Sequence, residues 1–376
     1  MIDPELRRLM DVMLERHASD LVLTQGQPPI IRVVGDLTPV EGRTLASADV
    51  QRLAYNLLTE EQQRSFEQTQ EMDCSFGLPG VARFRVNVFR QQGAVGLVIR
   101  MLPHEVPTLE ALGVPEVVNK WLMTPHGIIV TTGPTGSGKS TSQAAMIRFL
   151  NERKHYHVIT IEDPVEYTHP HGLCTIEQRE VGRDTRSFAD ALKRVFRQSP
   201  DVIMIGEMRD KETFETALQL AETGHLVLAT LHTGDATQSI SRIIDVFPPE
   251  QHQQVRVQLS LTLIGVLAQQ LVPKLDGHGR LLATEVLEAN AAVRNLIRKN
   301  EAQQLYSIIQ TSAGEHMNTM NASLVRLFKE GKISLEQAML FTTRQKELEQ
   351  LMAREARVPM LASERMSGLA SVAAKG

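Results

Sequence analysis

One stretch of this chain combines glycines, a lysine and a serine at the spacing of a phosphate-binding loop. An apolar run, residues 128–130, precedes it, and residues 141–150 are typical of a helix. Glycines let backbone N–H groups converge on a phosphate, and a helix N-terminus adds partial positive charge. Lys139 is expected to reach the β- and γ-phosphates of a nucleoside triphosphate, and the Ser140 hydroxyl to hold Mg²⁺. The residues expected to bind the nucleotide are Gly133, Pro134, Thr135, Gly136, Ser137, Gly138, Lys139, Ser140 and Thr141. The alternative is a surface turn that binds nothing, which the flanking strand and helix disfavour.

Two further stretches place carboxylates where apolar strands end. Residues 159–161 run into Glu162, Asp163 and Glu166, and residues 202–205 run into Glu207. The carboxyl ends of strands in parallel sheets face the ligand crevice. The first three carboxylates are therefore expected to order a water or Mg²⁺ beside the γ-phosphate, with a solvated acidic loop as the alternative. Glu207 ends a strand of the Walker B type, so it is expected to act on Mg²⁺ or its water shell.

Two histidines, His225 and His232, bracket the apolar run at residues 226–231. A neutral imidazole at such a position can sense a γ-phosphate or a water. The alternative is that both histidines are hydrogen-bonded at the strand ends without a role in chemistry. Metal ligation is not favoured, because no cysteine or paired histidine accompanies them.

The elements that position these residues change in character along the chain. Before residue 103, a helical pattern over residues 3–17 and alternating strands over residues 81–89 and 95–101 predict a small α+β domain. Arg85 and Arg100 lie on the polar faces of those two strands. Beyond Pro107, apolar strands alternate with helices, which predicts a parallel sheet buried on both faces and hence an α/β nucleotide-binding core. The predicted domains are residues 1–107, 108–290, a helical region 291–356 and a disordered tail 357–376.

Composition limits the classes of function. The 376 residues carry a net charge of −4, and aromatic residues make up 4%. Neither value favours nucleic acid as a partner, because no basic patch with interleaved aromatics is present. No apolar run approaches the ~20 residues that span a bilayer. With two cysteines and no signal-peptide pattern, the chain is expected to be cytoplasmic.

The combined motifs resemble those of the secretion-superfamily ATPases. Within that superfamily the chain is most similar to the type IV pilus retraction ATPases, the PilT/PilU family. The resemblance covers residues 1–345. It rests on the phosphate-binding loop, on the two carboxylate strands and on the stretch with His225 and His232. Three further segments match the family, namely Ala18-Ser19-Asp20-Leu21, Gly80-Val81-Ala82-Arg83-Phe84-Arg85-Val86-Asn87 and Ala292-Val293-Arg294-Asn295-Leu296-Ile297-Arg298.

The resemblance implies a PAS-like N-terminal domain joined to a RecA-like ATPase domain with C-terminal helices, in a homohexameric ring. It implies ATP and Mg²⁺ as cofactors, Glu166 as catalytic base and Glu207 as Walker B glutamate. Arg85 and Arg100 would reach the nucleotide when domains close, although surface-exposed strand arginines are the alternative. The implied function is an ATP-driven motor for pilus retraction and twitching motility. It would lie at the inner-membrane pilus base, with a platform protein and a paralogous retraction ATPase as partners.

Two departures from the family pattern bear on the assignment. Ser199 precedes Pro200 and Asp201 where family members often have an acidic residue, and the tail after residue 345 is longer than in the shortest retraction ATPases. The tail is similar to that of the accessory branch, whereas the segment from Ala292 to Arg298 is similar to the main branch. A type II secretion or pilus-assembly ATPase is disfavoured by the lack of a four-cysteine cluster. A nucleotide-gated accessory ring is disfavoured by the intact carboxylates.

Overall fold

The computed structural model describes residues 2–33, 35–78, 82–102, 105–312, 314 and 316–353. Pro103, at the predicted domain boundary, and the tail 357–376, predicted to be disordered, lie outside the described residues. The chain divides into two compact units. The first comprises Met1–Val106 with Glu162–Thr168, and the second comprises Pro107–Ile161 with His169–Gly376. This division does not separate residues 291–356 from the second unit, so those helices are described with it.

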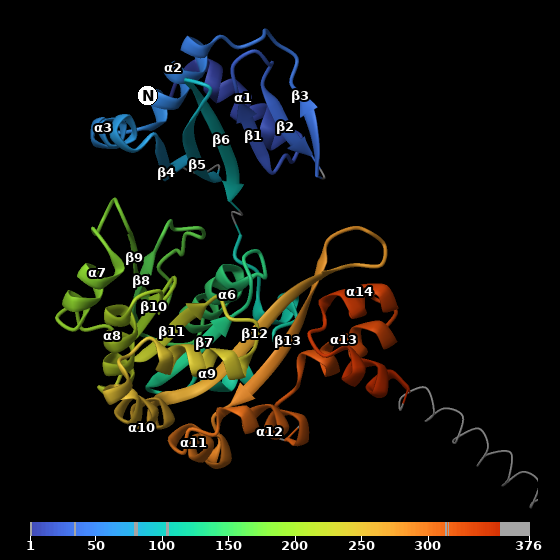
Figure 1. Ribbon diagram of the computed structural model, residues 1–376. Coiled ribbons are helices and arrows are strands. Elements are labelled where there is room, and N and C mark those ends of the chain that lie inside the picture. The colour runs from blue at the N-terminus through green and yellow to red at the C-terminus, as the bar shows by residue number, and fades with distance from the viewer. Residues whose placement is uncertain are drawn as a thin grey trace, which may run out of the picture. The chain divides into compact units, whose positions relative to one another are not determined.

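The first unit is an antiparallel sheet with helices on one face (Figure 1). Its strand order is β3-β2-β1-β6-β5-β4. Strand β5 shows why one face is covered, because Ala82, Phe84, Val86 and Val88 are buried while the residues between them are half-exposed. The elements are α1 (Pro4–Glu15), β1 (Asp20–Leu23), β2 (Ile30–Val33), β3 (Asp36–Pro39), α2 (Ser47–Leu57), α3 (Glu60–Thr69), β4 (Glu71–Leu78), β5 (Ala82–Gln91) and β6 (Ala94–Leu102). The α+β prediction for this part is confirmed.

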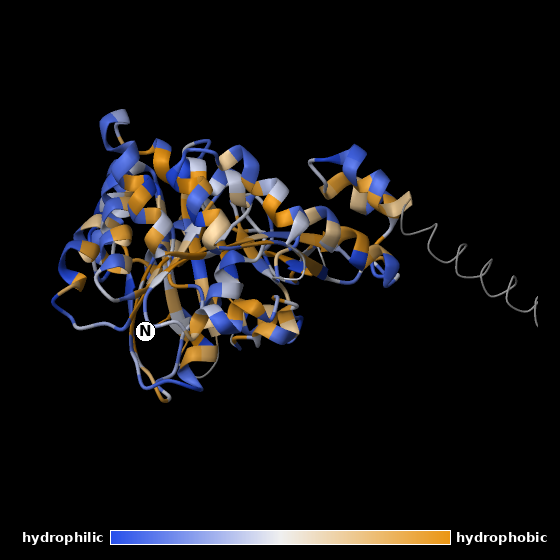
Figure 2. Cartoon of the chain, turned by 90° about the horizontal axis from the view of Figure 1, so that it is seen from below, coloured by the Kyte–Doolittle hydropathy of each residue, from blue (hydrophilic) through white to orange (hydrophobic). Residues whose placement is uncertain are grey.

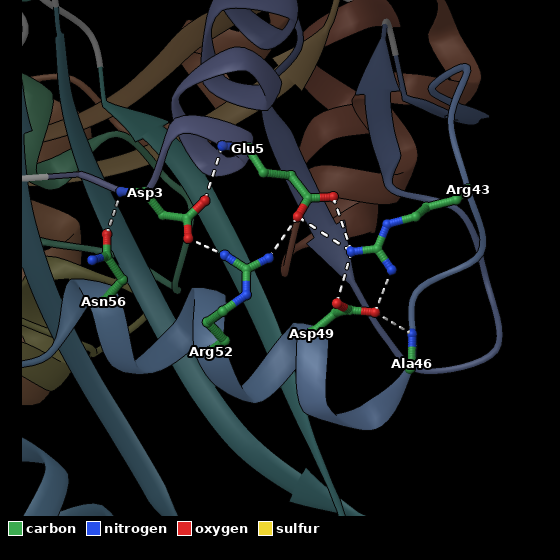
Figure 3. Close-up of polar contacts among 7 residues, drawn as sticks. All are labelled: Asp3, Glu5, Arg43, Ala46, Asp49, Arg52 and Asn56. Carbon is green, nitrogen blue, oxygen red and sulfur yellow. Dashed lines mark hydrogen bonds and ion pairs between the residues drawn. The ribbon is translucent and has the colours of Figure 1, made fainter.

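Ion pairs at the surface join the start of α1 to α2 (Figure 3). The Arg52 guanidinium contacts the carboxylates of both Asp3 and Glu5, and Arg43 contacts Glu5 and Asp49. The Arg43 guanidinium lowers the pKa of Asp49 to about 2. Because these side chains are solvent-accessible, the network is expected to orient the two helices rather than to supply much stability.

The second unit is built on a sheet with the strand order β13-β12-β7-β11-β10-β8-β9. Strands β12, β7, β11, β10 and β8 pair in parallel, and β13 is antiparallel to β12. The strands are β7 (Gly127–Thr132), β8 (His157–Glu162), β9 (Thr175–Glu180), β10 (Val202–Ile205), β11 (Leu226–Leu231), β12 (Leu263–Pro273) and β13 (Arg280–Glu288). The predicted parallel sheet is confirmed, but the sequence prediction named neither β9 nor β12.

Helices cover both faces of this sheet, and Figure 2 shows its central strands as largely hydrophobic. Ile128 of β7 packs on the side of α7 to α11, whereas Ile129 packs on the side of α4 to α6. A strand buried on both faces reads as a continuous apolar run, as observed in β7. The helices are α4 (Leu109–Leu112), α5 (Val117–Leu122), α6 (Lys139–Asn151), α7 (Phe188–Val195), α8 (Lys211–Glu222), α9 (Ala236–Asp245), α10 (His252–Thr262), α11 (Ala291–Arg298), α12 (Leu305–Thr311), α13 (Met320–Lys329) and α14 (Leu335–Phe341), with short 3₁₀ turns η1 (Pro249–Gln251) and η2 (Ala302–Gln304).

The last helices form a separate apolar cluster on the β12–β13 hairpin. Leu324 and Val325 of α13 pack with Val272 of β12 and Ala283 of β13. Among the described residues, no helix is both long and apolar enough to span a bilayer.

Burial of His169, between β8 and β9, predicts a pH-dependent stability. Its side chain is 8% exposed, and burial lowers its pKa from 6.5 to about 4. As the pH drops, the unfolded chain takes up the His169 proton at a higher pH than the folded chain does. The contribution of buried His169 to the free energy of unfolding is therefore fully present above pH about 6.5 and is lost as the pH drops towards about 4. The shift corresponds to about 3 kcal/mol. Urea unfolding of the unmodified chain and of His169→Gln should show a steeper acid loss in the former; parallel pH profiles would contradict this prediction.

Candidate functional site

The predicted phosphate-binding loop joins β7 to α6, and its glycines have backbone conformations that other residues rarely adopt. Gly133, Gly136 and Gly138 have φ values of +146°, +79° and +90°. A Cβ atom on Gly133 would stand 2.4 Å from the carbonyl oxygen of Gln269. Only glycine therefore fits at position 133, because of its backbone conformation and because a Cβ atom would collide with β12.

Lys139 begins α6 and is folded over the loop. Its side chain is 8% exposed, and Nζ donates to the carbonyl oxygens of Gly133 (2.8 Å) and Pro134 (3.0 Å). Ser140, the next residue, is exposed. The ammonium group thus lies at the N-terminus of a 13-residue helix, where the helix dipole also favours an anion.

Glu207 follows β10 and lies within a charged cluster. Its carboxylate contacts Arg209 Nε at 2.7 Å and His232 Nε2 at 3.3 Å. The Glu207 side chain is only 14% exposed, whereas that of Arg209 is 75% exposed. His232 comes directly after β11, so the ends of two neighbouring strands supply this cluster. The sequence prediction did not include Arg209, which lies two residues after Glu207.

Threonine hydroxyls join the loop after β11 to the start of the phosphate-binding loop. Thr132, the last residue of β7, donates through Oγ1 to the carbonyl oxygen of Thr233 at 2.7 Å. Its hydroxyl is also 2.8 Å from the Thr233 hydroxyl. Parallel pairing of β7 with β11 sets this contact, because Thr132 lies opposite Leu231. His232 and the phosphate-binding loop are therefore held at the same end of the sheet, where β7 and β11 have their carboxyl ends.

The carboxylates at the end of β8 and directly after it belong to the first unit of the structure. Glu162 is buried, Asp163 is exposed and Glu166 is half-buried. Next to Glu166, the carbonyl oxygen of Val165 accepts a 3.0 Å hydrogen bond from Arg83 Nε. Arg83 was not among the predicted site residues, although it lies on the same strand face as Arg85.

Arg85 and Arg100 lie directly opposite each other on β5 and β6. Each has its own acidic partner, because Arg85 Nε is 3.6 Å from Asp73 and Arg100 Nε is 2.7 Å from Asp20. Like charges at a directly opposed pair repel, and these carboxylates offset that repulsion. The structure thus brings the two predicted arginines together on one sheet face, and Arg100 remains 63% exposed.

His225 lies at the opposite end of β11 from His232. Its Nδ1 atom is 3.1 Å from the carbonyl oxygen of Leu220 and 3.2 Å from the Thr223 hydroxyl. The structure does not bring His225 into the cluster around Glu207. Its contacts are those of a histidine hydrogen-bonded at a strand end, which was the alternative reading of the sequence.

The residues of the second unit fit a nucleotide with Mg²⁺. The loop offers converging backbone N–H groups and Lys139 for phosphates, and the Ser140 hydroxyl is accessible. Glu207 supplies carboxylate oxygens after β10, which is separated from β7 by β11 alone. Among the described residues, no group of three or more His, Cys, Asp or Glu side chains is arranged to hold a metal by itself. Proteins hold Mg²⁺ with one or two side chains together with phosphates and waters, a role that Ser140 and Glu207 fit. Fold and site together define a P-loop nucleotide-binding protein.

Comparisons with known proteins agree with this class. The family model "Type II/IV secretion system protein" matches residues 4–340. The chain is 45% identical to the Type IV pilus retractation ATPase PilT of Pseudomonas aeruginosa over 89% of this chain and 97% of that protein. It is 43% identical to the Type IV pilus ATPase PilU of the same organism, over 89% of this chain and 88% of that protein. A crystal structure of the pilus retraction motor PilT with bound ADP matches with a TM-score of 0.86 and 48% identity, covering 91% of this chain and 98% of that one.

The chain therefore belongs to the type II/IV secretion system protein family, and within it to the PilT/PilU group of ATPases. The PAS-like and RecA-like fold class expected from the resemblance is confirmed by the match to the PilT structure.

The separate positions of the two histidines predict different effects on ATP hydrolysis. His232→Gln removes the imidazole that contacts Glu207, so turnover is expected to fall about tenfold or more. His225→Gln changes a group at the other end of β11, and its turnover should stay close to that of the unmodified chain. Steady-state phosphate release measures both. Equal losses in the two variants would show that position along β11 does not decide the effect.

Proposed function

We propose that this chain is a Mg²⁺-dependent ATPase that acts as a homohexamer and powers type IV pilus retraction. The observation that carries the proposal is the cluster of Glu207, His232 and Arg209. It lies at the carboxyl ends of the parallel strands, where the phosphate-binding loop also follows β7. The similarity to PilT, over 89% of this chain and 97% of that protein, supports the same assignment.

In this proposal each residue has a stated task. Gly133 to Thr141 cradle the phosphates of ATP, and Lys139 leaves its loop carbonyls to contact the β- and γ-phosphates. Ser140 and Glu207 hold Mg²⁺, which neutralises charge on the transferring phosphoryl group. Glu166 accepts the proton of the attacking water, with Glu162 and Asp163 ordering that water, and His232 keeps the Glu207 carboxylate in place. Arg85 and Arg100 contribute positive charge at the transition state when domains close.

The proposed location is cytoplasmic, at the inner-membrane pilus base, with a platform protein as partner. The charge balance and the composition give no support for a nucleic-acid partner. A deletion strain tests the function, because loss of retraction should leave surplus surface pili and abolish twitching, whereas loss of an assembly ATPase should leave none. Complementation with the unmodified gene should restore twitching, and Glu166→Gln should not. Pili that disappear in the deletion strain would overturn the proposal in favour of assembly.

The near-equal identity to PilU supports a second candidate, an accessory ring that assists another retraction ATPase. Purified protein separates the two. The motor should release phosphate with Mg²⁺ present and stop when EDTA is added, while an accessory ring should bind ATP and release little phosphate in either condition.

A further inference from the structure

A buried carboxylate, that of Glu285 in the middle of β13, contacts the first residues of two helices. Glu285 is 2% exposed. Oε1 accepts from the backbone N–H of Ala236 at 3.0 Å, and Oε2 accepts from that of Met320 at a longer 3.5 Å. Ala236 begins α9 and Met320 begins α13. Since the first N–H groups of a helix have no partner within the helix, one carboxylate serves two helix N-termini.

Burying the charged carboxylate of Glu285 costs free energy of folding. Burial raises the pKa of Glu285, and the neighbouring Asp235 carboxylate acts in the same direction, while the Ala236 N–H opposes the shift. An apolar residue would avoid that cost but would leave both N–H groups without this acceptor. The contacts of Glu285 therefore point to a role in holding the two helices in place.

On the side of α9, Glu285 fixes the loop that carries His232. The loop consists of residues 232–235, and Glu285 binds the residue that follows it. At its other end, Thr233 contacts the hydroxyl of Thr132 and, at 2.6 Å, that of Ser239. The loop is therefore held between Thr132, directly before the phosphate-binding loop, and Glu285.

On the side of α13, the same stretch of β13 anchors the C-terminal helices. The backbone N–H of Val286 donates to the carbonyl oxygen of Asn318 at 2.9 Å. The Asn318 side-chain amide donates to the carbonyl oxygen of Thr284 at 2.6 Å. The Ser323 hydroxyl accepts from the backbone N–H of Thr284 at 3.1 Å. A displacement of β13 near Glu285 must therefore move the start of α13.

We propose that Glu285 is a positioning residue that sets the His232 loop and couples the nucleotide state of the phosphate-binding loop to the C-terminal helices. Nucleotide contact at the loop shifts residues 232–235, the N–H of Ala236 moves with them, and the shared carboxylate transmits the change to Met320. This inference rests on the proposed function only in requiring that the phosphate-binding loop takes a nucleotide.

Hydrogen–deuterium exchange on the full chain, with and without ADP, tests the coupling. In the unmodified chain, ADP should slow exchange in peptides covering residues 232–240 and 318–326. In Glu285→Gln, which keeps the size of the side chain but offers one carbonyl oxygen instead of two, the response at 318–326 should be lost while ADP still binds. The kcat for ATP should fall about 10-fold to 100-fold from misplacement of His232, with KM unchanged. Because unfolded chains would also lower the apparent kcat without changing KM, kcat is calculated per ADP-binding site, titrated in the same sample.

Thr284→Val is the matched control, because Thr284 precedes Glu285 in β13 and its buried hydroxyl has no hydrogen-bond partner among the described residues. Its exchange pattern and kcat should equal those of the unmodified chain. If ADP binds but the 318–326 peptide does not respond, or responds equally in Glu285→Gln, the coupling is refuted and the proposed function stands. If ADP does not bind the unmodified chain at all, both are refuted.

Discussion

Lys139→Ala is expected to lower ATP hydrolysis by about 100-fold or more and to weaken nucleotide binding at the same time. The ammonium group of Lys139 holds two carbonyl oxygens of the phosphate-binding loop and stands at the N-terminus of α6. Removing it takes away a positive charge aimed at the phosphates and also loosens the loop that cradles them. Phosphate release and calorimetric titration with ADP measure the two effects.

Lys299→Ala is the control for this variant. Lys299 is an exposed lysine at the end of α11, so its removal changes the net charge equally without touching the loop. Its turnover and ADP affinity should match those of the unmodified chain. If Lys139→Ala kept normal turnover, the phosphate-binding assignment of residues 133–141 would be wrong.

Local sequence patterns are enough to predict those features of the fold that depend on residues close together in the chain. The run from Ile128 to Val130 is apolar on every residue because both faces of β7 are buried. Residues 82–88 alternate because one face of β5 is buried and the other is half-exposed. Asp210 and Ser187 cap α8 and α7 with their side chains, as expected from residue type. These features need no knowledge of distant segments.

Other features depend on contacts that the sequence does not display. Strand β12 was missed because α10 ends at Thr262 and the strand starts at Leu263, with no intervening turn residue to separate them. The two histidines are equivalent in the sequence, yet the direction of β11 puts only His232 beside Glu207. Glu285 gave no signal, because its partners are backbone N–H groups of helices that begin 49 and 35 residues away in the chain.

Glu207→Gln is expected to separate binding from hydrolysis. The amide has nearly the same shape as the carboxylate but no charge, so it cannot pair with Arg209 or hold Mg²⁺ as a carboxylate does. Because the phosphate-binding loop is untouched, ADP affinity should remain, while kcat falls about 100-fold. This result differs from that of Lys139→Ala, in which binding and turnover fall together.

Glu212→Gln provides the comparison, since Glu212 lies on the surface of α8 and pairs with Lys193 at 2.7 Å. An exposed pair of this kind contributes little, so its kcat and ADP affinity should be unchanged. Normal turnover in Glu207→Gln would remove Glu207 from the reaction and leave the cluster with Arg209 and His232 as a structural ion pair. Loss of ADP binding together with turnover would instead make Glu207 part of the nucleotide pocket. Only retained binding with lost turnover fits a carboxylate that acts on the metal and its water at the transition state.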